Sequence, residues 1–145
     1  MQRQRVVTGI TTGLLPAATT SGMLLGFGIR LGAPARVFQA IGTVITGGST
    51  AIAVSPRATI AGVVLHLIVM LASGVAYVAL LGDSDDQRAA WAITIGAALT
   101  ACAFMLAKTF AGSIALVLTP GNLVALGVVT AITLPIGMRF APSRV

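Results

Sequence analysis

The chain has 145 residues, of which 57% are apolar and only 8% are charged, with nine lysines and arginines against three acids. A soluble domain carries about 25% charged residues, so this composition excludes a single domain whose surface faces water. Lipid must be the solvent for most of the surface. The bases are scattered singly and form no basic stripe with interleaved aromatic residues, which excludes nucleic acid as a partner.

The first candidate span covers residues 6–29. A transmembrane helix needs about 20 mostly apolar residues, and this range is long enough and uncharged. The charged start followed by an apolar run imitates a signal peptide. We expect the segment to be retained as the first span, with its basic residues as a cytoplasmic anchor.

Glycines recur four residues apart within this first span. Gly9 and Gly13 form one such pair, and Gly22 and Gly26 form another. Residues four apart lie on one helix face, and small residues there let a second backbone approach closely in lipid. The pattern predicts close helix packing at all four glycines. Whether the partner helix belongs to this chain or to another stays open.

Residues 37–54 are uncharged but are broken by Gly47-Gly48, and they lie between Arg36 and Arg57. Eighteen residues are at the lower limit for a span. Three interpretations compete: a re-entrant segment, a helix at the membrane interface, or a fifth short span. We favour a membrane-associated segment over a full span. Ser55-Pro56 ends it and begins the next helix, with proline near the first helical position.

The second span, residues 58–81, contains the only histidine of the chain. A titratable residue inside a membrane is costly and marks a functional site by default. His66 shares a face with small and polar residues at three-to-four spacing, and this face should meet protein rather than lipid. The residues predicted to pack there are Gly62, Ser73, Gly74 and Tyr77, with Met70 on the same face.

Three roles for His66 follow from its position. The simplest is a neutral imidazole that is hydrogen-bonded to a neighbouring helix. A second is axial ligation of haem or (bacterio)chlorophyll, with Gly62 leaving room for the flat macrocycle. A third is a proton relay with Ser73 or Tyr77, although none of the spans contains a carboxylate.

The polar loop 82–88 holds all three acids of the chain. Asp85 or Asp86 is expected to cap the third span, residues 89–107, because acidic side chains suit a helix N-terminus. A calcium site is disfavoured, since calcium takes six to eight oxygen ligands. Trp91 stands where interfacial tryptophan belongs.

The fourth span covers residues 119–138. Thr119-Pro120 is a helix-start signal, and Pro135 should kink the helix near its end. With four spans and the N-terminus inside, five bases lie on the cytoplasmic side and four on the other. The positive-inside rule then predicts a multi-pass protein of the bacterial inner membrane with both termini in the cytoplasm.

The second span resembles a pattern in small bacterial membrane proteins of the YagU-like kind. Those proteins carry a G-x-x-x-H helix that ends in G-x-x-(Y/F)-A-L-L, and here Gly62 and His66 are followed by Gly74, Tyr77 and a terminal Ala-Leu-Leu. The glycine-rich first span is also similar. The resemblance implies a four-span bundle and lends no function.

Motifs for catalysis are missing from the sequence. There is no Ser/His/Asp set within the spans, no HExxH, no phosphate-binding glycine loop and no CxxC, so we expect no enzyme and no metal site. Glycine faces and short loops favour a small accessory or structural subunit that packs with lipid and with other transmembrane helices, in a hetero-complex or a homo-oligomer. The alternatives are a small oligomeric transporter or channel lined by His66, and a haem- or chlorophyll-binding subunit.

Overall fold

The protein is all-helical over the residues that the computed structural model describes, which are 2–47, 55–81, 86–110, 114–115 and 117–141. It has five helices: α1 (Gln2–Arg30), α2 (Arg36–Thr46), α3 (Pro56–Leu81), α4 (Arg88–Thr109) and α5 (Pro120–Arg139). All except α2 are long and apolar enough to cross a membrane. The prediction of a polytopic helical bundle with four spans is therefore confirmed.

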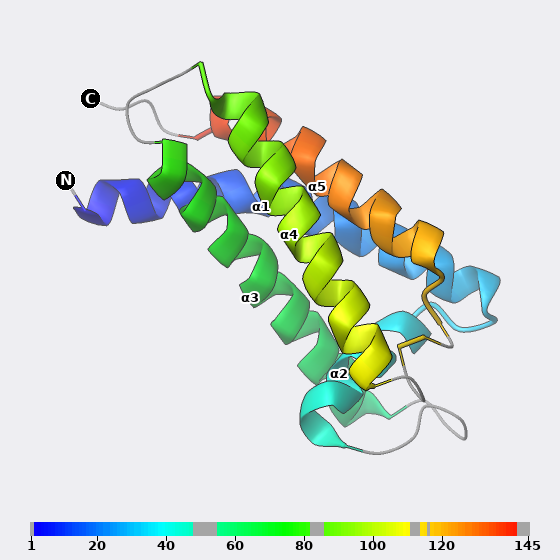
Figure 1. Ribbon diagram of the computed structural model, residues 1–145. Helices are drawn as coiled ribbons and strands as arrows, with labels where there is room; N and C mark the ends of the chain where they lie inside the picture. The colour runs from blue at the N-terminus through cyan, green and yellow to red at the C-terminus, as the bar shows by residue number, and fades with distance from the viewer. Residues whose placement is uncertain (1, 48–54, 82–85, 111–113, 116, 142–145) are drawn as a thin grey trace.

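The helices pack in the order α2, α3, α1, α5, α4, and α3 and α4 meet only loosely where the ring of helices would close. Figure 1 shows α4 running between α3 and α5. The start of α1 and the end of α5 lie at the same end, because Gly137 of α5 packs on the carbonyl of Thr12. In a regular helix the carbonyl of Thr12 would accept a hydrogen bond from the N–H of residue 16. Pro16 has no N–H, so this carbonyl is free for the contact with Gly137.

Glycines bring α1 and α3 into backbone contact. A Cβ at Gly13 would lie 2.7 Å from the carbonyl oxygen of Met70, and one at Gly9 would lie 2.5 Å from the Cα of Val75. Gly74 meets both glycines from the opposite side. The two helices are antiparallel at this crossing, and only glycine fits there.

Gly22 and Gly26 behave differently from Gly9 and Gly13, because the described chain supplies no packing partner for them. A Cβ at either position would meet no atom within 4 Å, so neither glycine packs on another helix of the described chain. The reason is geometric. At 3.6 residues per turn, this pair lies roughly 140° around α1 from the pair formed by Gly9 and Gly13. One face of α1 therefore meets α3, and the other carries two unpartnered glycines.

The segment expected at the membrane between the first two spans contains α2, whose 11 residues extend only about 16 Å. That is too short for the ~30 Å core, so α2 is not a fifth span. It lies antiparallel on the first half of α3, where Gly42 meets the carbonyl of Ala58 and Gly62 meets that of Phe38. Residues 48–54 of the predicted segment lie outside the described part of the chain.

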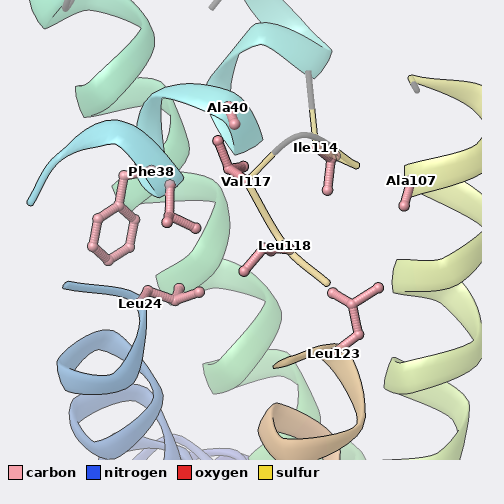
Figure 2. Packing of buried hydrophobic residues seen from close by; sticks show 9 residues of the cluster. Leu24, Phe38, Ala40, Ala107, Ile114, Val117, Leu118 and Leu123 are labelled. Carbon is pink, nitrogen blue, oxygen red and sulfur yellow. The ribbon is translucent and has the colours of Figure 1, made fainter. Parts of the chain in front are cut away.

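A hydrophobic cluster fills the end of the bundle near α2. Figure 2 shows Leu24 of α1 and Phe38 of α2 in it, together with Val117 and Leu118 from the segment before α5. A second cluster at the opposite end centres on Tyr77, which has no exposed surface. The two clusters hold the ends of the bundle, and the face of α3 that carries His66 runs between them.

Helix starts follow the predicted signals at α3 and α5 but not at α4. The hydroxyl of Thr119 accepts a hydrogen bond from the backbone N–H of Asn122, with Pro120 as the first residue of α5. At α4 the N-cap residue is Gln87 and no side chain caps the helix. The amide oxygen of Gln87 accepts a hydrogen bond from Trp91 Nε1 instead. The prediction that Asp86 caps this helix is therefore wrong. Asp85, the other predicted cap, lies outside the described residues.

Candidate functional site

His66 occupies the middle of α3 and is buried at 8% exposure. Its Nε2 atom lies 3.0 Å from the hydroxyl oxygen of Thr20 on α1. Thr20 is itself fully buried and donates its single hydroxyl hydrogen to the carbonyl of Pro16, 2.5 Å away. Nε2 and Oγ1 form a hydrogen bond between the two helices, and the tautomer of the imidazole decides which atom donates.

An aromatic contact fixes the imidazole from the side of α2. The rings of Phe38 and His66 meet edge to face, with centroids 5.8 Å apart and planes at 72°. Edge-to-face pairs are a favoured arrangement of aromatic rings. Three helices therefore hold the histidine: α3 carries it, α1 bonds it and α2 packs on it.

Gly62 lies one turn before His66 on the same face of α3. In the cofactor-binding alternative this glycine would leave room for a macrocycle, but the structure shows no such room. The backbone of α2 occupies the space, with the carbonyl of Phe38 against Gly62 and the N–H of Gly42 beside it. The glycine permits a helix–helix contact, and the Nε2 atom of His66 is already hydrogen-bonded to Thr20.

The other polar residues of this face do not form a chain from His66. Ser73 donates its hydroxyl to the carbonyl of Val69, 2.7 Å away on its own helix. Tyr77 lies 11 residues beyond His66, about 16 Å along the helix, and its hydroxyl donates to the carbonyl of Arg88, 3.2 Å away. The two hydroxyls stabilise separate parts of the bundle and offer no direct proton path.

An apolar cavity of about 220 Å³ lies inside the ring of helices, next to His66. Helices α3, α4 and α5 supply most of its wall, and α1, α2 and the segment before α5 supply the rest. The lining residues are Thr20, Leu24, Ile41, Val44, Leu65, His66, Val69, Met70, Leu99, Thr100, Cys102, Ala103, Leu106, Ile114, Leu118, Leu123, Leu126, Gly127 and Thr130. Sequence patterns did not reveal this cavity, since its lining comes from all five helices.

The hydroxyls in the cavity wall are already bonded. Thr100 donates to the carbonyl of Gly96, and Thr130 donates to that of Leu126. Among the described residues, the one buried side-chain oxygen or nitrogen without a partner is Thr59 Oγ1, which does not line the cavity. The described residues also contain no cluster of three potential metal ligands.

A second hollow, of about 570 Å³, lies on the outer side of the bundle between α4 and α5. Its floor is the close contact of Gly96 with the carbonyl of Gly127. Small residues on α4, including Ala97 and Ala101, form one of its sides. This hollow lies along α4, a helix that is largely uncovered.

No family model, curated protein or solved structure matches the chain. The resemblance to YagU-like proteins stays a prediction.

Proposed function

We propose that the chain is a small, non-catalytic accessory or structural subunit that packs in a larger membrane complex, and that it meets its partner through the outer face of α4. The observation that carries this proposal is the exposure of α4. Only 11% of its most apolar window is buried in the bundle, against 33–39% for the other three long helices. A helix so little covered by its own chain has most of its surface available to another helix.

The exposed side of α4 carries a seam of small residues. Ala90, Thr94, Ala97 and Ala101 are spaced four, three and four apart, and all four are exposed. This spacing is that of a coiled-coil seam, and small residues permit close approach of a second helix in lipid. The opposite face of α4 is used within the chain, since Ala92 and Ile95 are buried there.

The outer hollow between α4 and α5 adds an independent argument. It borders the seam at Ala97 and Ala101, and its volume of about 570 Å³ leaves space beside α4 for side chains of another helix. In lipid the hydrophobic effect does not drive helices together, because the lipid tails are as apolar as the helices. Helices therefore associate through close van der Waals packing. The seam and the hollow together favour a transmembrane helix of another subunit as the partner.

The proposed setting is the bacterial inner membrane, with the end that carries Arg3, Arg5 and Arg88 in the cytoplasm. The positive-inside rule supports this orientation. The alternative roles as a transporter or a cofactor carrier draw less support, because the polar groups around His66 are engaged in helix contacts.

Two substitutions on the seam and one matched control test the proposal. Ala97→Leu and Ala101→Leu place a bulky side chain on the seam, and Ala72→Leu does the same on an exposed position of α3. We expect the chain to leave its membrane complex in mild detergent when either seam residue is changed, and to stay in it with Ala72→Leu. Native mass spectrometry measures the assembly. A wild-type chain that migrates only as a monomer would overturn the proposal, and a complex made only of identical copies would assign the seam to a homo-oligomer.

A further inference from the structure

We infer that the cavity beside His66 is a binding site for a hydrocarbon chain that enters from the bilayer between α3 and α4. This site is separate from the outer face of α4. The first argument is its size and chemistry. An apolar cavity of about 150 Å³ inside a protein stays dry and takes up small apolar molecules, and this one has a volume of about 220 Å³ with a mostly aliphatic wall.

The second argument concerns what the wall can bind. Thr20, Thr100 and Thr130 already donate their hydroxyl hydrogens to backbone carbonyls. His66 Nε2 is used on Thr20. A polar ligand would have to displace these bonds, and a buried polar group without a partner is costly. A hydrocarbon chain forms no hydrogen bonds, so it can bind in the cavity without breaking those of the wall.

The third argument is the route of entry. Helices α3 and α4 make few contacts with each other, and the cavity lies behind the gap between them. Cys102 and Leu106 of α4 line the cavity and are also exposed on the surface of the bundle. The surrounding solvent at this depth is lipid, so the molecules that reach the opening are acyl chains or the prenyl tails of membrane lipids.

Photolabelling of the full chain in nanodiscs tests the inference. One arm uses a phosphatidylcholine with a diazirine in the middle of its acyl chain, and the other uses a diazirine-bearing prenyl lipid. Adducts on Met70 and Leu123 are diagnostic, because both residues line the cavity but are only 7% and 3% exposed. Annular lipid labels exposed residues and does not reach these two.

Two substitutions fill the cavity from facing walls, and each has a matched control. Ala103→Phe and Val69→Phe project a ring into the cavity, whereas Ala98→Phe and Val64→Phe carry the same change at exposed positions that do not line it. We expect the adducts on Met70 and Leu123 to be lost in the first two variants and kept in the controls. The two filling variants lie on different helices, so the test still stands if one of them fails to fold. Circular dichroism shows whether each variant is folded.

The outcomes separate the alternatives. Labelling in both arms supports a general hydrocarbon site, and labelling in one arm supports the site and names the source of the chain. Adducts restricted to exposed residues in both arms would overturn the inference. Equal labelling of Met70 and Leu123 in the filled and wild-type proteins would overturn it as well.

Discussion

His66 Nε2 lies 3.0 Å from Thr20 Oγ1 and joins the middle of α3 to the middle of α1. The bond crosses 46 positions of sequence and involves the one imidazole of the chain. It gives the buried histidine a structural partner inside the membrane. Contacts with α1 and α2 together hold α3 in place.

Thr20→Val should destabilise the protein by about 1–2 kcal/mol. The substitution keeps the shape of the side chain but removes the hydroxyl that is hydrogen-bonded to His66, and a buried polar group without its partner costs about this much. Unfolding in mixed micelles measures the free energy. Thr20→Ser keeps the hydroxyl and should recover most of the loss. Equal stability of the valine variant and the wild type would show that the bond contributes nothing.

Gly62→Ala and Gly42→Ala should each destabilise the protein by about 1–3 kcal/mol, the usual cost of overpacking. The added methyl group meets backbone at both sites, so α2 must move away from α3. The same unfolding assay applies, with accessibility of a cysteine at Ile45 as a reporter of α2.

Gly22→Ala and Gly26→Ala are the matched controls for these glycine substitutions. A Cβ at either position meets open space, and alanine is favoured over glycine within a helix by up to about 1 kcal/mol. We expect unchanged or slightly raised stability of the isolated chain. A loss at these positions comparable to that at Gly62 would contradict the assignment of the two faces of α1.

Haem added to the purified protein should give the same absorption spectrum with wild type and with His66→Ala. The backbone of α2 fills the space beside Gly62, and Nε2 is engaged with Thr20. Spectroscopic titration in detergent provides the measurement. A Soret band that shifts with wild type and not with the alanine variant would show that α2 moves aside for the cofactor.

Single cysteines should report both ends of the chain on one side of the membrane. In a Cys102→Ser background, cysteines at Gln4 and Arg139 should react with a membrane-impermeant maleimide from the same side, and a cysteine at Thr109 from the other. The reason is that α1 begins and α5 ends at the same end of the bundle, whereas α4 ends at the opposite one. Right-side-out and inverted vesicles make the comparison. Labelling of residues 4 and 139 from opposite sides would contradict the four-span arrangement.

Part of the candidate site could be predicted from residue spacing alone. The three-to-four pattern of Gly62, His66 and Tyr77 predicts a face turned toward protein, and all three residues are buried in the structure. Thr20 was missed, although a signal existed. It lies at about the same angle around α1 as Gly9 and Gly13, so the packing face of α1 could have pointed to it among the other threonines of that helix.

The sequence by itself determined the solvent and the long helices. Composition requires lipid around the chain, and uncharged runs of about 20 residues mark each crossing because the bilayer has a fixed thickness. These are local properties, readable along the chain without knowledge of any partner segment.

Only the tertiary structure decided which helices meet and what lies between them. Both glycine pairs of α1 have the same spacing, yet only Gly9 and Gly13 meet α3, because a contact depends on the direction that a face takes relative to a second helix. The backbone of α2 beside Gly62 and the cavity beside His66 arise in the same way. Each is set by several distant segments, and no single stretch of sequence encodes it.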